Sequence, residues 1–298
     1  MTAAPPSGAG GFEEHLDRWG THSAKWDLLA ARLGPEAVSM SVADMELRTA
    51  PCVIDAVTAA ARHGTYGYTE VFDDFRRAAV LWQRERHGWA PEPDCVRFFP
   101  RVVQCVSALL NVVLPDRRAA RPVVVTLDPA YGPLLEVAER SGAEIRRVLL
   151  LLDDFPASPA RIDIPALERA LDGADLFLLC NPHNPVGRVW QNAELERIAE
   201  ICLRRRVLVV ADEIHEEFIR PGFTHTPFAA ISPEAAAITV TCTSPSKTFN
   251  LAGLQISNIF IKNDELRSRF RTERGKTGYD EPNTLGLSAA HAAYEHGA

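Results

Sequence analysis

Short runs of apolar residues recur along the chain, separated by longer segments in which apolar and polar residues alternate at helical spacing. The runs are rich in Val, Ile and Leu, which is typical of strands that are buried on both faces of a sheet. Strands that alternate with helices predict an α/β fold, a mostly parallel sheet flanked by helices on both faces. The predicted strands span residues 38–43, 96–99, 123–127, 144–151, 176–180, 207–211, 238–241 and 256–261.

The segments between these runs carry the signals of helices. Pro51 suits the first turn of a helix that starts near Thr49, and Val53, Ile54 and Val57 follow at helical spacing. The other predicted helices span residues 73–87, 102–114, 165–171, 194–204, 264–274 and 283–294, with one more after Tyr131.

Composition and charge limit the class of protein. The 298 residues are 46% hydrophobic, which is enough for a large core. A net charge of −7 gives no electrostatic reason to expect a nucleic acid or a membrane as a partner. The first residues lack the pattern of a signal peptide, and no apolar stretch is long enough to cross a bilayer. Six cysteines without a CxxC pair or metal-ligand spacing predict reduced thiols, no metal and a cytoplasmic protein.

Polar residues follow three of the predicted strands closely. Asp212 comes directly after the strand at 207–211, Asn184 follows the preceding strand, and Lys247 lies in a polar turn between the last two strands. Ligands of open α/β sheets collect at the carboxyl ends of strands, so these residues predict a common site. A lysine there is costly to desolvate unless its amine is paired or reacts, which makes Lys247 a Schiff-base candidate. The alternative is a lysine that points out of a loop into water.

Three motifs occur in a telling order: Asn181-Pro-His-Asn-Pro-Val-Gly187, then Asp212-Glu-Ile-His215, then Ser244-Pro-Ser-Lys-Thr-Phe-Asn-Leu-Ala-Gly-Leu-Gln255. Together they resemble the fold-type I pyridoxal 5'-phosphate (PLP) enzymes of the class I/II aminotransferase family, and within it the cysteine-S-conjugate β-lyases of the cystathionine β-lyase type. Lys25-Trp-Asp27, Val42-Ala-Asp-Met45 and Gly67-Tyr-Thr69 resemble the N-terminal signatures of that group. The likeness runs from about Phe12 to Ala298.

The resemblance implies a PLP site with three catalytic residues. Lys247 would form the Schiff base and act as the base, Asp212 would face the ring nitrogen, and Tyr131 would stack on the ring. The other cofactor-binding residues that it implies are Asn184 and His215 at the ring oxygen, Ser244 and Ser246 at the phosphate, the helix-start amides of Val102 and Val103, and Tyr68 from a neighbouring subunit.

Plainer alternatives stay open for several of these residues. For Tyr68 the alternative is a tyrosine that caps the core, and for His215 a strand-end histidine that is satisfied by the backbone. The helix after Arg101 is either a phosphate cradle or an ordinary core helix. Arg101 itself stands where family members usually carry a small residue, so it either changes the turn or adds a cationic contact to the phosphate. Asp44 lies either near the substrate or merely in a strand-to-helix turn.

The resemblance also implies a reaction. Gln255 stands where many aminotransferases have a phosphate-binding arginine, which favours the lyase subgroup. The implied reaction is an α,β-elimination that releases a thiol, pyruvate and ammonia from cystathionine or another cysteine S-conjugate. The alternatives are a PLP-dependent aminotransferase and an inactive, truncated PLP-fold protein. The implied partners are a small amino-acid substrate and a second copy of the chain in a homodimer.

The resemblance divides the chain into three parts. We expect residues 1–11 to be a flexible tail, residues 12–48 to form an N-terminal arm with a short helix and part of a small domain, and residues 49–298 to form the large PLP-binding domain. The family carries an arginine for the substrate carboxylate in a C-terminal small domain. We expect that domain to be truncated or absent here, and substrate binding to be weakened for that reason.

Overall fold

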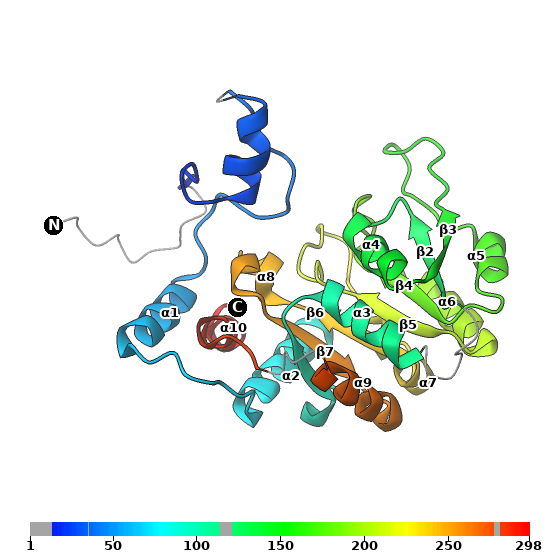
Figure 1. The fold of residues 1–298 in the computed structure, drawn as a ribbon. Coiled ribbons are helices and arrows are strands. Elements are labelled where there is room, and N and C mark those ends of the chain that lie inside the picture. Colours follow the sequence, from blue (N-terminus) through cyan, green and yellow to red (C-terminus); the bar gives the residue numbers. More distant parts are fainter. Residues whose placement is uncertain (1–13, 35, 114–120, 277–280) are drawn as a thin grey trace.

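The computed structural model describes residues 14–34, 36–113, 121–276 and 281–298. A seven-stranded sheet in the order β1-β7-β6-β5-β4-β2-β3 runs through them (Figure 1). Neighbours among β2 to β6 pair in parallel, whereas β7 is antiparallel to both β6 and β1. The strands are β1 (Val96–Phe99), β2 (Val123–Asp128), β3 (Glu144–Leu149), β4 (Leu176–Cys180), β5 (Leu208–Asp212), β6 (Thr239–Thr243) and β7 (Ser257–Ile261).

Helices connect the strands and cover both faces, which confirms the predicted α/β fold with a mostly parallel sheet. The predicted helices are present with ends that differ by at most a few residues. The helices are α1 (Pro51–His63), α2 (Asp73–His87), α3 (Val102–Val113), α4 (Gly132–Arg140), α5 (Ile164–Ala170), α6 (Asn192–Arg205), α7 (Pro233–Ala237), α8 (Pro245–Thr248), α9 (Asp264–Lys276) and α10 (Thr284–His296).

Separate apolar clusters lie on the two faces of the sheet. Consecutive strand residues point to opposite faces, so Val209 packs with α5, α6 and α7, while Val210 packs with α3, α4 and α9. A third cluster joins α1, α2 and α10 to β1 and β7 around the buried rings of Phe75 and Trp82. Figure 1 shows α10 beside α1 at this end of the sheet. The site described below therefore stands on a rigid, doubly covered frame.

Local signals explain where several helices begin and end. Pro51 occupies the first position of α1, as predicted, and Gly64 ends that helix at φ 76°, a left-handed conformation that glycine adopts without strain. The short helix α7 was not predicted. Its signal is nevertheless in the sequence, because Ser232 accepts a hydrogen bond from the Ala235 amide and Pro233 takes the first helical position.

The N-terminal arm differs from the prediction at one point. The strand predicted at residues 38–43 is wrong: the chain is irregular there, and Val38 and Met40 are exposed. The apolar alternation has no neighbouring strand to pair with, and pairing is what makes such a pattern a strand. The predicted short helix is present as a π-helical turn, Ala24–Leu29, followed by a 3-10 turn at Ala30–Arg32. The tail predicted at residues 1–11 lies outside the described residues.

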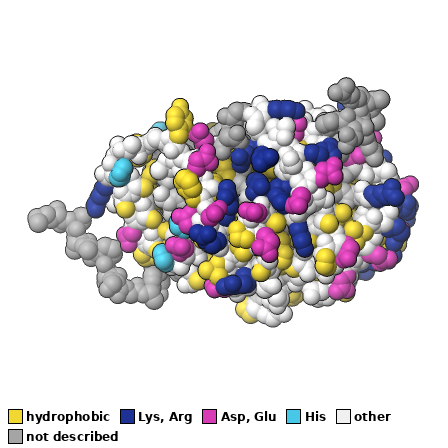
Figure 2. Space-filling model, turned by 90° about the horizontal axis from the view of Figure 1, so that it is seen from below, with side chains coloured by type: hydrophobic (Ala, Val, Ile, Leu, Met, Phe, Trp, Pro, Cys, Tyr) yellow, Lys and Arg dark blue, Asp and Glu magenta, His cyan; other side chains and the backbone are white. Residues whose placement is uncertain are grey.

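The surface seen from below carries both signs of charge (Figure 2). Acidic and basic side chains are interspersed over this face, with several basic ones near its middle, so this face is not dominated by a single sign of charge. Among the described residues, no helix combines the length and the apolar character that a membrane span requires.

Candidate active site

The three polar segments singled out in the sequence meet at the carboxyl edge of β4, β5 and β6. The strands are in register, so that Cys180, Asp212 and Cys242 are Cα neighbours across the sheet. Asp212 is the last residue of β5, and α8 with Lys247 follows β6 after a single residue. Asn184 lies in the turn that follows β4. The topology therefore brings these residues to one edge, as the strand pattern predicted.

Lys247 lies in a one-turn helix, α8, where the sequence predicted a simple polar turn. The cap is Ser244, whose hydroxyl accepts a hydrogen bond from the Ser246 amide at 3.1 Å. The same hydroxyl donates to the Ile256 carbonyl at 2.6 Å, just before β7 begins. This bond joins the two ends of the segment that carries Lys247.

Lys247 and Asp212 act on each other electrostatically. Asp212 is only 6% exposed, and burial raises its pKa to about 6 although the positive charge of Lys247 opposes the shift. Burial lowers the pKa of Lys247, while the carboxylates of Asp44 and Asp212 act in the opposite sense. The only hydrogen bond that the Asp212 carboxylate receives from the described residues comes from the Ile214 amide at 3.3 Å. The carboxylate therefore has capacity for a further, cationic partner.

Tyr131 closes this pocket from the start of α4. Its ring is 42% exposed, and burial together with the negative charge of Asp212 raises the pKa of its hydroxyl. Tyr131, His183 and Asp212 line one apolar pocket. The buried His183 donates from Nε2 to the Pro129 carbonyl at 2.8 Å and so holds the backbone two residues before Tyr131. His183 belongs to the asparagine-proline motif, but sequence reasoning gave it no role.

Asn184 lies in the turn after β4, and His215 lies in the turn after β5, three residues beyond Asp212. Asn184 is half-buried, and its backbone nitrogen lies 3.4 Å from Cys180 Sγ. Its side chain makes no hydrogen bond to the described residues. Burial and the nearby charge of Lys247 lower the pKa of His215 to about 4, so this imidazole is neutral near pH 7. Both side chains are thus able to donate a hydrogen bond to a ligand, and the roles implied for them stay predictions.

The start of α3 offers the predicted anion-binding amides. The amides of Gln104 and Cys105 already donate to the Arg101 carbonyl at 3.1 and 3.2 Å, which leaves those of Val102 and Val103 without an intrahelical acceptor. The exposed Arg101 lies close enough to Tyr131 for its charge to lower the pKa of that phenol. Of the two predicted serine ligands, Ser246 has the free hydroxyl, because Ser244 donates its proton to Ile256.

The N-terminal arm docks on the lysine segment. Asn250 accepts from the Met45 amide at 3.0 Å and donates to the Met45 and Leu47 carbonyls at 2.8 and 3.2 Å. Lys247 Nζ donates to the Ala43 carbonyl at 2.7 Å. Asp44 is therefore held beside the lysine, and the place near a substrate that the resemblance implied for it stays a prediction. Asn250 was missed as a positioning residue, although it lies in the quoted lysine motif.

Asp44 is held from the arm as well as from the lysine segment. Arg18 Nη1 lies 2.9 Å from Asp44 Oδ2, and the buried Lys25 donates to the Asp44 carbonyl at 3.1 Å. Lys25 also lies 2.6 Å from Glu46 Oε1. Together with the bonds to Asn250 and Lys247, these contacts hold the arm against the lysine segment rather than as a free extension.

Tyr68 does not join these residues within one chain. It is 96% exposed in the loop between α1 and α2, and its neighbour Thr69 contacts Thr284 at the start of α10, 2.6 Å between the two hydroxyls. The alternative that Tyr68 caps the core is therefore wrong. Its predicted reach to the phosphate of a neighbouring subunit stays a prediction.

Comparison with known proteins agrees with this geometry. The family model for aminotransferase class I and II matches residues 36–295. Cystathionine beta-lyase PatB of Bacillus subtilis strain 168 is 37% identical over 289 residues, which cover 96% of this chain and 73% of that relative.

Two solved structures resemble the whole described fold. The PLP-bound putative aminotransferase of Clostridium difficile 630 superposes with a TM-score of 0.90 at 32% identity, covering 96% of this chain and 73% of that one. The PLP-bound C-S lyase of Staphylococcus hominis superposes with a TM-score of 0.86 at 29% identity, covering 97% of this chain and 71% of that one. With a family model matched over most of its length, this chain belongs to the class I and II aminotransferase family.

Proposed function

We propose that this protein is a PLP-dependent C–S β-lyase that releases a thiol, pyruvate and ammonia from cystathionine or another cysteine S-conjugate. The observation that carries the proposal is a buried carboxylate, Asp212, and a half-buried lysine amine, Lys247, whose charges shift each other's pKa, with Tyr131 lining the same pocket as Asp212. The named relatives support it, since one is a cystathionine β-lyase and another a C–S lyase.

The donor set of the pocket fits PLP. The Asp212 carboxylate has capacity for a protonated ring nitrogen. Asn184 and the neutral His215 have free donors for the ring oxygen, and the start of α3 has free amides for a phosphate. PLP, once bound to an amino acid, supplies an electron sink that stabilises a carbanion at the α-carbon. We infer that Ser246 is the serine that contacts the phosphate, because the Ser244 proton is committed to Ile256.

Lys247 would move the proton in this reaction. Its lowered pKa increases the fraction of free amine near neutral pH, which suits a group that must accept a proton from the α-carbon. The Ala43 carbonyl, 2.7 Å from Nζ, gives the amine a resting position beside the pocket. Asp212 would hold the ring nitrogen in its protonated state, and Tyr131 would exclude water from one face of the ring.

An aminotransferase is the second candidate. It is favoured by the name of one solved relative, a putative aminotransferase. Both reactions begin with proton transfer at the α-carbon and differ in what leaves next. Gln255, in place of a phosphate-binding arginine, favours the lyase, and it lies at the end of the lysine segment with φ 51°. Products therefore decide between the two candidates.

We further propose that the protein acts as a homodimer in the cytoplasm. Tyr66, Tyr68 and Phe72 are exposed together in the loop before α2, and a second copy would cover them. Tyr68 would then reach the phosphate site of the partner. All six cysteines are free, and five are buried, which suits a reducing compartment.

The decisive experiment combines chemical trapping with product analysis. The chain is mixed with PLP, reduced with borohydride and digested, and mass spectrometry locates the cofactor; we expect it on the peptide of Lys247. Lys247→Ala should lose both the label and turnover, whereas Lys262→Ala, a matched exposed lysine, should keep both.

Pyruvate and thiol from L-cystathionine support the lyase. A new amino acid from an amino donor and a keto acid, without pyruvate from cystathionine, supports the aminotransferase. A label on another lysine contradicts the site itself.

A further inference from the structure

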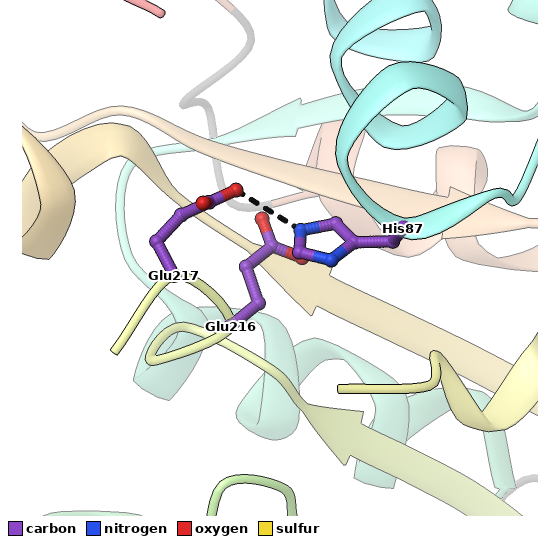
Figure 3. A group of neighbouring side chains, drawn as sticks. All are labelled: His87, Glu216 and Glu217. Carbon is purple, nitrogen blue, oxygen red and sulfur yellow. Dashed lines mark hydrogen bonds and ion pairs between the residues drawn. The ribbon is translucent and has the colours of Figure 1, made fainter. Parts of the chain in front are cut away.

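Behind the strand end that carries Asp212, two histidines and three glutamates form a closed cluster between α2 and the segment that follows β5. Figure 3 shows part of it, with the His87 ring at the end of α2 facing Glu216 and Glu217. None of these side chains has a role in the proposed reaction. The members of the cluster are His87, Glu213, Glu216, Glu217 and His225.

One half of the cluster is well partnered. Glu217 accepts from His87 Nε2 at 3.0 Å and from Arg86 Nη2 at 2.7 Å. Gln83 Nε2 donates to both carboxylate oxygens of Glu216, each at 3.0 Å. This half is a hydrogen-bonded network that ties α2 to the segment after β5, and its member Glu216 also borders the other half.

The other half is buried without partners. His225 is 3% exposed, and neither of its ring nitrogens has a hydrogen-bond partner among the described residues. Glu213 is fully buried; its Oε1 accepts from the Phe228 amide at 2.8 Å, but its Oε2 has no partner either. The two unpartnered atoms face each other, with His225 Nε2 3.5 Å from Glu213 Oε2. Buried polar atoms are nearly always partnered, so this pair points to a group that lies between them.

The separation between His225 and Glu213 matches the coordination of a small cation, and Glu216 lies within reach of both. Zinc bonds to nitrogen and oxygen of about 2.0 to 2.2 Å place two ligand atoms of a tetrahedral ion roughly 3.3 to 3.6 Å apart. His225 Nε2 and Glu213 Oε2 are 3.5 Å apart, and ligand atoms of Glu213, Glu216 and His225 all lie within 4.8 Å of one another. We propose that these three residues bind one divalent cation of the zinc class, with water in the fourth position.

The chemistry of the donor set selects the class of metal. One imidazole and two carboxylates suit zinc and its transition-metal neighbours, whereas Mg²⁺ and Ca²⁺ prefer oxygen ligands alone. The charges agree with a divalent ion. Arg86 compensates Glu217, but Glu213 and Glu216 face only histidine rings and an amide, so two buried carboxylates are left for one doubly charged cation.

Protons on the two carboxyl groups are the alternative to a metal. A protonated Glu213 would still lie 3.5 Å from His225 Nε2, which is longer than an ordinary hydrogen bond from a carboxylic acid. Hydrogen bonds hold both carboxylates in place, as outer partners hold the ligands of a metal site. The Phe228 amide donates to Glu213, and the Gln83 side chain donates to both oxygens of Glu216.

Such an ion would have a structural role. It would link residues 213 and 225, the two ends of the segment that follows β5, and through Glu216 it would link that segment to α2. The segment begins directly after Asp212. The metal would therefore stiffen the backbone that carries the Asp212 carboxylate without contacting the cofactor pocket.

Cobalt(II) is the probe for the first test, because tetrahedral cobalt absorbs visible light and replaces zinc in sites of this kind. The chain is unfolded and refolded with a chelator and then with cobalt, both with and without PLP. We expect about one tightly bound cobalt ion per chain, independent of PLP, and a melting temperature that the chelator lowers. Absence of stoichiometric cobalt, and a melting temperature that the chelator leaves unchanged, would overturn the proposal.

Variants place the ion. Glu213→Gln, Glu216→Gln and His225→Gln should each weaken cobalt binding by at least about 10-fold. His291→Gln is the matched control, because His291 forms a His–Glu pair of similar length outside the cluster, 3.3 Å from Glu295 on α10, and the variant should bind cobalt as the parent does. Equal binding by all four variants contradicts the assignment.

A crystal of the cobalt-loaded parent protein removes any dependence on variants that fold poorly. Anomalous scattering should place the ion among Glu213, Glu216 and His225. An ion elsewhere, or none in a crystal grown with cobalt, overturns the proposal, whatever the outcome of the PLP experiments.

Discussion

Asp212 and Glu213 follow each other at the end of β5, yet their side chains lie in different regions of the molecule. Asp212 faces the pocket that Tyr131 and His183 also line, and the charge of Lys247 acts on it. Glu213 faces the opposite side of the sheet, where the Phe228 amide and His225 enclose it. Alternation along the strand is enough to separate them.

The comparison shows what a neighbour does to a buried carboxyl group. Burial raises the pKa of Asp212 to about 6 and that of Glu213 to about 8. The Ile214 amide and the positive charge of Lys247 oppose the shift of the Asp212 pKa, whereas the Phe228 amide and His87 oppose that of Glu213. Equal burial therefore yields one carboxyl group poised to meet a cationic ligand and one that is costly to ionise without a partner.

Replacing Asp212 should give the largest effect. Asp212→Asn keeps an oxygen for the Ile214 amide but removes the charge that would face the cofactor nitrogen. We expect kcat/KM to fall about 100- to 1,000-fold, with a change in unfolding free energy of less than about 1 kcal/mol. Steady-state kinetics and urea unfolding measure the two quantities. Activity within about tenfold of the parent would show that this carboxylate does not serve the reaction.

Replacing Glu216 should reduce stability more than activity, the reverse of what we expect for Asp212. Glu216→Ala leaves the Gln83 amide buried without its acceptor, so we expect a loss of about 1 to 3 kcal/mol in unfolding free energy and a smaller effect on kcat. Urea unfolding is the measurement. Glu200→Ala, which removes an exposed partner of Arg197 and Arg204 on α6, is the control and should change stability much less. Equal losses in the two variants would mean that the closed cluster adds nothing to the fold.

His183 should give the smallest effect, and it depends on pH. Burial lowers its pKa below the ordinary 6.5, although the Asp128 carboxylate and the Pro129 carbonyl oppose the shift. The unfolded chain binds a proton below pH 6.5 while the folded chain does not, so this group makes stability fall as the pH drops through that window. Below the pKa of His183 in the folded chain, both states bind the proton, so His183 causes no further loss of stability.

His183→Asn tests that sign. We expect it to cost about 0.5 to 1.5 kcal/mol at pH 8 through the lost bond to Pro129, and to flatten the decline in stability below pH 6.5. Urea unfolding at a series of pH values measures both. His63→Asn, at the exposed end of α1, should follow the parent curve, and a decline as steep in His183→Asn as in the parent would contradict the assignment.

The sequence alone predicts well both the sheet with its flanking helices and the strand ends that form the site around Asp212. Strand runs such as those ending at Cys180 and Asp212 are strong signals, because short runs rich in Val and Leu between helical segments are typical of buried strands, and the polar residues after them mark the edge. The lone reversal, β7, could not be predicted, because an apolar run carries no sign of its direction. The run at residues 38–43 failed because a strand needs a partner, which local sequence does not reveal.

The closed cluster could not be predicted from the sequence, for a different reason. Gln83 and Glu216 are 133 residues apart, and nothing in either neighbourhood indicates that they meet. His225 reads as an ordinary loop residue, and Glu213 as part of the Asp212 motif. Asn250 was similarly hidden, since its partners at Met45 and Leu47 are some 200 residues earlier in the chain. Contacts between distant segments, rather than local patterns, define these positions.

The clasp between the Ser244 hydroxyl and the Ile256 carbonyl has a practical consequence for protein engineering. This hydrogen bond joins the two ends of the connection between β6 and β7, so residues 245–255 form a loop whose ends are fixed to each other. Ala252 and Gly253 are exposed on that loop. Libraries at these two positions would retune access to the lysine for bulkier substrates, while the pairing of the two antiparallel strands stays as it is.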